Sequence, residues 1–574
     1  MKKLPIGIQT FERLIEGNYL YIDKTKEACD LIDSGSIFYF LSRPRRFGKS
    51  LFLSTLQSIF EGKKELFEDL YIYDKWDWET KYPVIKISFA GNLRSPEGLK
   101  NTIFGMLKDN QEKLGVECGD IEDVGVCLKE LIKLSHDKHK QQTQTGKKMK
   151  KLPIGIQTFH EIITKDYLYI DKTKEAYDLI ESGTKFYFLS RPRRFGKSLF
   201  LSTLQSIFEG KKELFEDLYI YDKWDWETKY PVIKIDFFGD LRSAENLEKT
   251  ILGMLKSNQD KLGVVCDDVN SVGLCLKELI EKAYKKYNQQ VVVLIDEYDK
   301  AILDNLDQME VAKENREIIK GLYSVLKGSE EYIKFSFLTG VSKFSRASIF
   351  SGLNMLEDIS LEPKYGNICG YTQSNIENEF KKYLVDVDLE KLKVWYNGYN
   401  FLKDDVYNPF DILLFIKKEF LYKNYWFVTG TPTFLIKLIE QNNYFLPQLS
   451  NLTIGDEILD SFDIDNIQLE VILYQAGYLT IKSMEIDEDD DIIYHLKLPN
   501  REVKSSLNQF IINTMYQDRS LLRKNISKAL REVDLEAFKK AFEVIFASIP
   551  YNNYTKNNLP LYEGFYASVV YVYL

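Results

Sequence analysis

The chain has few of the residues that build metal clusters or disulfide frameworks. It contains 6 Cys and 4 His among 574 residues, and no close Cys pair or Cys-His cluster predicts a zinc site. Two Cys pairs, Cys118 with Cys127 and Cys266 with Cys275, recur at the same spacing. We interpret all the cysteines as reduced thiols of a cytoplasmic protein.

The sequence also lacks a long hydrophobic run. No stretch approaches the roughly 18 apolar residues that cross a bilayer, and the N-terminus has no apolar segment long enough for a signal peptide. We therefore expect no membrane association and a cytoplasmic location. Hydrophobic residues make up 44% of the chain and charged residues 28%, as in an ordinary globular protein.

An excess of basic charge is missing as well. The formal net charge is −9, which argues against non-specific coating of nucleic acid, because such binding depends on neutralising phosphates with Lys and Arg. A nucleic acid in a local basic groove and a protein both stay open as clients, and an oligomer is possible. The acidic run 487–491 predicts a solvated hairpin tip, since it lacks the Gly and spaced acids of a calcium loop.

A long stretch of the amino-acid sequence occurs twice. Residues 38–87 recur unchanged at 186–235, and a looser likeness runs from Leu4, opposite Leu152, to Gln142, opposite Gln290. The period is far longer than the 20–50 residues, roughly, of a solenoid repeat. We interpret the repeat as a partial tandem duplication of the front half of a domain. The first copy is then either a relic or a regulatory part.

Each copy contains a loop that is typical of phosphate binding. In the second copy an apolar run precedes the text SRPRRFGKS, which ends at Ser198, and a helix-like segment follows. Successive N–H groups at a helix N-terminus bind phosphate. We expect ATP to be bound by Arg193, Arg194, Phe195, Gly196, Lys197, Ser198 and Leu199. Lys197 would also act in catalysis on the β- and γ-phosphate oxygens, and the Ser198 hydroxyl would hold Mg²⁺.

The loop departs from the usual phosphate-binding pattern at its start. Arg191 stands where another Gly is common. With Arg193 and Arg194 it offers three cations, and we expect these to contact phosphate directly.

The second copy alone continues into an acidic strand end. The apolar run 291–295 is typical of a strand buried on both faces, and Asp296 and Glu297 follow it. We expect Asp296 to hold Mg²⁺ and Glu297 to be the base that activates water. Thr339, after another strand-like run, is a further catalytic candidate that would sense the γ-phosphate or orient the water. Arg346 is either an arginine finger or, more simply, a solvated side chain.

These elements predict an α/β fold, a P-loop NTPase core of the additional-strand, AAA-like type with a parallel sheet. The first loop, with Lys49, has the same text but no acidic strand of its own. We therefore expect it to contribute little catalysis, although it could bind phosphate weakly or borrow the Asp296 strand.

The sequence resembles a bacterial and archaeal AAA-ATPase-like family whose members are often joined to a PD-(D/E)XK nuclease-like domain. The matching text lies at 152–157, 159, 169–173, 191–198, 294–299, 348–354, 395–399, 407–410, 425–427 and 429–432. The resemblance covers most of the chain after Met149. It implies that the loop and the acidic strand bind and hydrolyse ATP and that a helical lid follows the ATPase core; an Arg in place of the early Gly is a habit of this family.

The end of the chain resembles the start of the family's nuclease region. The text 559–566 would place Glu563 on the first helix of that fold. A working site also needs an Asp and a Glu/Asp-x-Lys on later strands to hold Mg²⁺, and the chain stops at Leu574 before either. We interpret this part as truncated and expect no nuclease activity.

We expect four parts. They are a partial duplicate of the P-loop half-domain at 1–146, an AAA-like ATPase core at 149–365, a helical lid at 366–450, and an α+β C-terminal region at 451–574. The expected function is Mg²⁺-dependent ATP hydrolysis coupled to lid movement for an unidentified client. The alternative is a degenerate remnant that acts as a nucleotide-binding or interaction protein without turnover.

Overall fold

The chain forms two compact units that we describe separately. A computed structural model describes residues 2–5, 7–33, 38–88, 95–119, 124–138, 150–267, 271–343, 355–427, 452–456, 468–515, 526 and 528–547. The first unit comprises Met1–Gly155 with Lys165–Tyr167, and the second comprises Ile156–Thr164 with Leu168–Leu574.

The first unit is helical where it is described. Its elements are α1 (Phe11–Glu16), α2 (Thr25–Asp33), α3 (Lys49–Phe60), the 3-10 helix η1 (Lys64–Phe67), α4 (Pro96–Leu114) and α5 (Val124–Lys138). Phe11, Ile59 and Phe67 form a small core between α1, α3 and η1. Leu107 and Leu131 centre a second cluster between α4 and α5. No strand occurs among the described residues of this unit.

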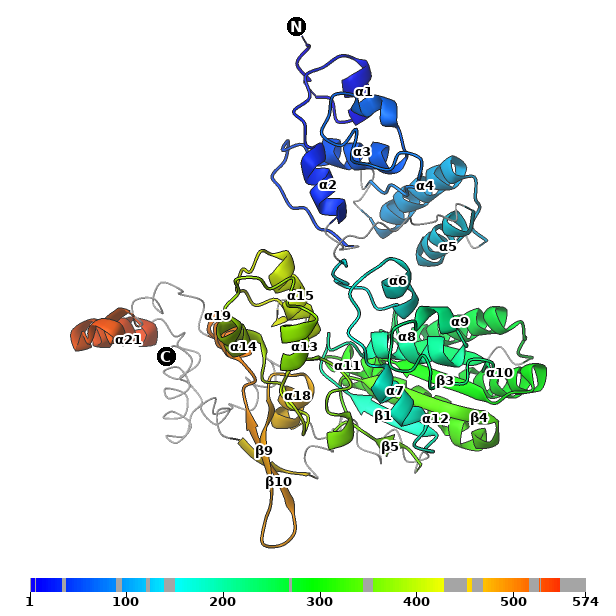
Figure 1. The fold of residues 1–574 in the computed structure, drawn as a ribbon, viewed down its shortest axis with the longest axis vertical. Helices are drawn as coiled ribbons and strands as arrows, with labels where there is room; N and C mark the ends of the chain where they lie inside the picture. Colours follow the sequence, from blue (N-terminus) through cyan, green and yellow to red (C-terminus); the bar gives the residue numbers. More distant parts are fainter. Residues whose placement is uncertain are drawn as a thin grey trace. The chain divides into compact units, whose positions relative to one another are not determined.

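A five-stranded parallel sheet organises the second unit (Figure 1). Its strands are β1 (Phe186–Ser190), β2 (Val232–Asp236), β3 (Val291–Asp296), β4 (Ile333–Gly340) and β5 (Glu357–Asp358), in the order β2-β3-β4-β1-β5. β4 therefore lies between the strand before the phosphate-binding loop and the strand that ends in Asp296. This is the additional strand expected for an AAA-like core.

Helices cover the sheet because parallel strands need crossover connections and bury both faces. They are α6 (Phe159–Thr164), α7 (Thr173–Ile180), α8 (Lys197–Phe208), η2 (Lys212–Leu214), α9 (Ala244–Leu262), α10 (Val272–Tyr287), α11 (Lys300–Leu303), α12 (Met309–Gly328) and η3 (Glu330–Tyr332). α8 packs on β3 and β4, and α10 packs on α9 and α12. None of the helices in the described part of the chain has the length and apolar character that a membrane span requires.

Short elements follow the sheet along the chain. They are η4 (Pro363–Tyr365), β6 (Tyr371–Thr372), α13 (Gln373–Asn378), α14 (Leu389–Tyr396), β7 (Val406–Tyr407) and α15 (Pro409–Lys417). β6 and β7 pair antiparallel. The elements from β6 onward lie in the expected lid region, of which residues 428–450 are outside the described part.

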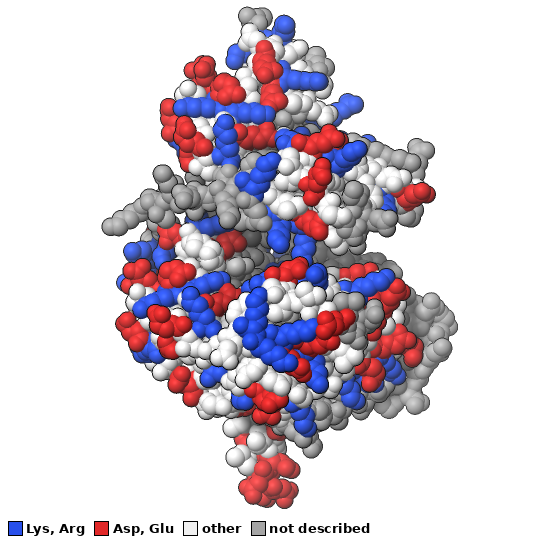
Figure 2. All heavy atoms as spheres, turned by 90° about the vertical axis from the view of Figure 1, so that its right-hand side faces the viewer, with Lys and Arg blue, Asp and Glu red and all other residues white. Residues whose placement is uncertain are grey.

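The C-terminal region mixes helices with a second, antiparallel sheet. Its elements are β8 (Leu452–Gly455), α18 (Leu469–Gln475), β9 (Thr480–Ile486), β10 (Ile492–Lys497), α19 (Arg501–Met515) and α21 (Leu535–Ala547). The strand order is β8-β10-β9. The acidic run 487–491 forms the turn between β9 and β10, as predicted, and its exposed tip appears as a red cluster (Figure 2). The nuclease-like text and Glu563 lie outside the described residues.

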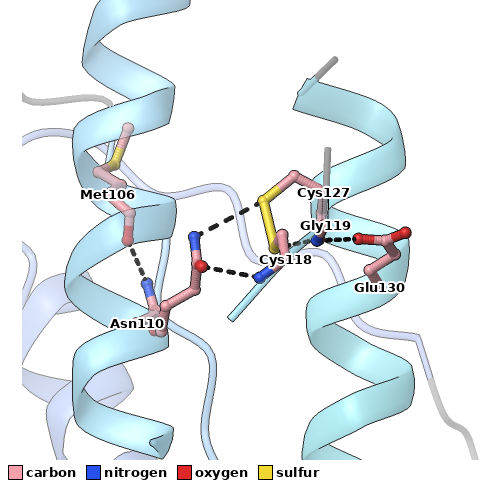
Figure 3. The surroundings of a disulfide bond; sticks show 7 residues. Met106, Asn110, Cys118, Gly119, Cys127 and Glu130 are labelled. Carbon is pink, nitrogen blue, oxygen red and sulfur yellow. Dashed lines mark hydrogen bonds between the residues drawn. A yellow bond between two sulfur atoms is a disulfide. The ribbon is translucent and has the colours of Figure 1, made fainter. Parts of the chain in front are cut away.

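The cysteines do not all remain thiols, which corrects our interpretation of the sequence. Cys118 and Cys127 form a disulfide between the end of the α4 region and α5 (Figure 3). Their Cα atoms are 5.3 Å apart, within the range a disulfide requires. The fold supplies this proximity, which a spacing of nine residues does not reveal. In the second unit Cys266 and Cys275 are thiols, and Cys266 Sγ donates to the Cys275 carbonyl at 3.1 Å.

Candidate nucleotide-binding site

The loop after β1 ends in a helix N-terminus of the kind that binds phosphate. Gly196 has φ of 101°, a left-handed conformation that favours glycine. α8 begins at the next residue, Lys197, so the free N–H groups of its first turn face the mouth of the loop. Ser198 and Leu199 are half-buried there.

Lys197 lies inside the loop. Its Nζ donates to the carbonyls of Arg191 at 2.8 Å and Pro192 at 3.2 Å. Burial lowers the pKa of Lys197, while Asp296, Asp299 and Glu297 favour its charged form.

Arg191 does not face the phosphate position, contrary to our expectation. Its side chain is buried, and its guanidinium donates to the carbonyls of Ser190 at 2.9 Å, Ser360 at 2.7 Å and Tyr365 at 3.3 Å. It also stacks over the ring of Phe401, 4.0 Å from the centroid. A Gly at this position could supply none of these contacts. Arg191 therefore stabilises the start of the loop through these contacts.

The other loop residues divide between solvent and core. Arg193 and Arg194 are exposed, and the Arg194 guanidinium lies over the Phe410 ring at 4.9 Å. The Phe195 side chain points into the core, edge-on to Tyr399 at 4.8 Å. Phe195 could therefore meet a ligand only through its backbone.

The acidic strand end is pre-arranged around Asp296. This residue is fully buried at the end of β3. Its Oδ1 accepts hydrogen bonds from the Thr339 hydroxyl at 2.6 Å and the Glu297 amide at 3.0 Å. Its Oδ2 is buried and has no hydrogen-bond partner among the described residues. Buried polar atoms are nearly always satisfied, so this oxygen is one that a ligand could satisfy.

Thr339 touches Asp296 rather than standing free at the strand end. β3 and β4 are adjacent and parallel, which brings their carboxyl ends together. The hydroxyl donates a hydrogen bond to the carboxylate and so orients it. Its expected action on the γ-phosphate or the water stays a prediction.

Glu297 adopts an unusual backbone conformation beside the buried acid. Its φ of 51° lies in the left-handed region that few non-glycine residues occupy. Burial raises the pKa of its half-buried carboxyl, Lys197 lowers it and Asp296 raises it further. A carboxylate with a raised pKa is a stronger base at neutral pH.

Asp299 stabilises the loop after β4. It is buried, and its Oδ2 accepts from the Val341 amide at 2.9 Å, the Ser342 amide at 2.5 Å and the Ser342 hydroxyl at 2.6 Å. The sequence alone predicts no role for Asp299. Its spacing, three residues after Asp296, was the available signal.

Asp236 is a site residue that the sequence reasoning missed. It ends β2 and pairs in register with Asp296. Burial, reinforced by Asp296, raises the pKa of Asp236 to about 7, and its Oδ1 is buried without a hydrogen-bond partner in the described part of the chain. The signal was an acid at the end of a second apolar strand. The first copy has Ser88 at this position.

The segment after the sheet touches the loop from outside. The Arg193 carbonyl accepts from Trp426 Nε1 at 3.1 Å and from Asn408 Nδ2 at 3.4 Å. The Phe195 carbonyl accepts from the Gly370 amide at 3.1 Å. The loop is therefore joined by hydrogen bonds to the region that we expect to be the lid. Arg346, the weaker candidate, lies outside the described residues.

The sheet order and the loop together define a class of protein, the P-loop-like nucleotide-binding domains. The model of the family described as "Predicted AAA-ATPase" matches residues 5–144 and, again, 153–350. The chain belongs to this AAA-ATPase-like family.

A relative from Azotobacter chroococcum mcd 1 supports this membership. It is 45% identical over 428 residues, which cover 74% of this chain and 82% of the relative. Its description is "Uncharacterized protein in vnfD 5'region", so it supports the family without adding an activity.

Proposed function

We propose that the second unit binds ATP with Mg²⁺ at the loop 191–198 and hydrolyses it. The observation that carries the proposal is the buried, unpartnered Oδ2 of Asp296, in a cluster of acids that acts on Lys197. A carboxylate oxygen without a donor suits a hard cation.

The residues present fit Mg²⁺ that arrives with the nucleotide. Mg²⁺ in such sites takes one or two protein oxygens and completes its shell with phosphate oxygens and water. The described residues contain no group of three or more His, Cys, Asp or Glu placed to hold a metal ion together. Asp296 and the Ser198 hydroxyl would hold the ion, which would stabilise the negative charge on the transferred γ-phosphoryl group and on the leaving ADP.

The roles of the other residues follow from their positions. Backbone N–H groups from Arg193 to Leu199 would bind phosphate oxygens at the start of α8. Lys197 would leave the Arg191 and Pro192 carbonyls to meet the β- and γ-phosphates. Glu297 would accept a proton from water, whose oxygen attacks the γ-phosphorus as the bond to ADP breaks. Thr339 would hold Asp296 in place.

Hydrolysis would then act on the segment that touches the loop. The Arg193 carbonyl accepts hydrogen bonds from Trp426 and Asn408. A change in loop conformation on phosphate binding would therefore alter these two hydrogen bonds directly. We propose that α13–α15 form the lid and that its movement serves a protein or nucleic-acid client.

The direct test is turnover of Mg·ATP by the full chain. We expect phosphate release that needs Mg²⁺ and disappears in Asp296→Ala. Binding of ATP without any release would leave the alternative, a nucleotide-binding remnant. Absence of both binding and release would refute the proposal.

A further inference from the structure

The two copies of the repeated text do not have the same structure. Residues 186–190 form β1, whereas the identical residues 38–42 form no strand. Phe186, Phe188 and Phe195 are 2%, 2% and 1% exposed, while Phe38, Phe40 and Phe47 are 80%, 94% and 70% exposed. Because the letters are the same, the difference comes from what lies beside them. In the second unit that neighbour is β4, flanked by β3.

The first unit nevertheless keeps the internal framework of its counterpart. The Phe11 amide donates to Ser54 at 3.0 Å and the Phe159 amide to Ser202 at 2.9 Å. Asn110 accepts from the Lys86 amide at 2.9 Å, as Asn258 does from Lys234 at 2.9 Å. The first unit thus keeps these two hydrogen bonds of its counterpart, although residues 38–42 and 84–88, the counterparts of β1 and β2, form no strand.

The first loop has the shape of the second as well. Gly48 has φ of 78°, and α3 starts at Lys49. The Lys49 Nζ donates to the carbonyls of Arg43 at 2.5 Å and Pro44 at 2.9 Å, the counterparts of Arg191 and Pro192. The described residues of the first unit contain no strand that could place an acid beside this loop.

We propose that the two copies are alternative partners for one set of strands, β3 and β4, within a single chain. In the second arrangement residues 38–42 lie beside β4, and the first loop with Lys49 forms the nucleotide site with Asp296 and Glu297. Residues 149–290 are then displaced and left without these strands. The proposal extends the proposed function, because it assigns a second, mutually exclusive nucleotide site to the same acids.

Chain connectivity permits the exchange. The first copy ends at Gln142, which corresponds to Gln290, and β3 begins at the next residue, Val291. In the second arrangement residues 143–290 become an insertion at this point. In the present arrangement the turn before β3 contains the exposed Asn288. Insertions at exposed turns are tolerated, and the closure cost of a loop rises only slowly with its length.

Two features favour the arrangement that the structure shows. It needs no long insertion before β3, and it places Asp236 rather than Ser88 beside Asp296. The second arrangement is therefore the minor one, and its site lacks one carboxylate. A substitution that harms only the second copy will shift the balance toward the first.

The test uses three variants of the full chain. Phe188→Asp places a charge in the buried core, on the strand that pairs with β4. Its matched control is Phe40→Asp, which changes the equivalent residue of the first copy, where the side chain is exposed. The double variant removes both apolar partners. Hydrogen exchange is read at residues 38–41, 186–189 and 333–340; the first two are told apart by mass because different residues precede them in each copy.

We expect Phe188→Asp to gain protection at 38–41, lose it at 186–189 and keep it at 333–340, with β4 unprotected only in the double variant. If β4 loses as much protection in Phe188→Asp as in the double variant, there is no exchange and the proposal is wrong. Gained protection that occurs only in an oligomeric fraction would place the exchange between chains and contradict the intrachain form.

Turnover separates this proposal from the proposed function. In Phe188→Asp we expect ATP hydrolysis, reduced by at least tenfold, that is lost on adding Lys49→Ala and unchanged on adding Lys197→Ala. Dependence on Lys197 instead would overturn the assignment of the second site. If the parent chain itself hydrolyses no ATP, the proposed function fails, and the exchange data still decide the strand exchange independently.

Discussion

The Thr339 hydroxyl donates a hydrogen bond to Asp296 Oδ1 at 2.6 Å and leaves Oδ2 of the same carboxylate without a partner among the described residues. The two residues end adjacent parallel strands. The contact holds the carboxylate in one orientation before any ligand arrives, and it leaves the second oxygen free of this hydrogen bond.

Thr339→Val should weaken Mg²⁺-dependent turnover and lower the stability of the second unit. Valine keeps the shape of threonine but removes the donor, which leaves Asp296 Oδ1 with only the Glu297 amide and costs about 1–3 kcal/mol, the loss of one hydrogen bond to a buried charged group. Denaturant unfolding and the Mg²⁺ concentration for half-maximal turnover measure the two effects. Thr339→Ser, which retains the hydroxyl, is the control, and equal behaviour of the two variants would contradict the role of this bond.

Lys197→Ala should abolish stabilisation by Mg·ATP, whereas Lys49→Ala should leave it nearly unchanged. Ligand at 100 times its dissociation constant stabilises a fold by about 2.7 kcal/mol. A thermal melt with and without Mg·ATP measures the shift. The two lysines occur in identical text, so the pair is its own control. A shift that survives in Lys197→Ala and vanishes in Lys49→Ala would give the main site to the first loop.

Glu297→Gln should retain ATP binding and lose turnover by about 10²–10⁴-fold, the usual contribution of a general base. Burial raises the pKa of Glu297, and only the ionised form accepts a proton. Turnover of the parent should therefore fall on acidification at a pH above that of an ordinary Glu. Glu317→Gln, on an exposed residue of α12, should have no effect. Full turnover in Glu297→Gln would assign the base elsewhere.

The sequence alone predicted those elements that depend on a short stretch of consecutive residues. The apolar run before Asp296 predicted a buried strand, and Val291–Asp296 is that strand. Gly196 and Lys197 begin a helix where the motif requires one. These features need only a strand, a loop and a helix in succession, so short-range patterns reveal them.

Long-range contacts decided what the sequence could not show. Arg191 was expected at the phosphate, but its partners Ser360 and Tyr365 lie far along the chain. Asp236 became a candidate only when the register placed it beside Asp296. Residues 38–42 show most clearly what local sequence cannot predict. The same five residues form a buried strand in the second copy and are exposed in the first.

The buried acids Asp411 and Glu502 should make stability depend on pH. Burial raises the pKa of Glu502 to about 7 and also raises that of Asp411. In the unfolded chain such groups ionise near pH 4–4.5. Since the folded state holds its protons more tightly, this contribution to stability is complete below about pH 4 and declines as pH rises toward 7.

Glu502→Gln should flatten that decline by about 2 kcal/mol between pH 4.5 and 7, an order-of-magnitude value. Denaturant unfolding at several pH values measures it. Glu536 is the second residue of α21, as Glu502 is of α19, but it is exposed, so Glu536→Gln is the matched control. An unchanged slope in Glu502→Gln would show that this carboxyl is ionised in the folded protein.

Trp426 should report on the loop and influence it. Its Nε1 donates to the Arg193 carbonyl, and its amide donates to Glu502 at 2.8 Å, so it joins the phosphate-binding loop to α19. We expect Mg·ATP to change the tryptophan fluorescence of the parent, because phosphate binding moves the Arg193 carbonyl. Trp426→Phe should remove most of that signal and weaken ATP binding by about 3–10-fold, the loss of one hydrogen bond.

Trp226, whose Nε1 donates to the Tyr221 carbonyl at 2.8 Å, is the control position, and Trp226→Phe should keep both signal and affinity. A parent whose fluorescence ignores saturating Mg·ATP, or a Trp426→Phe variant with undiminished signal and affinity, would separate the expected lid from the nucleotide.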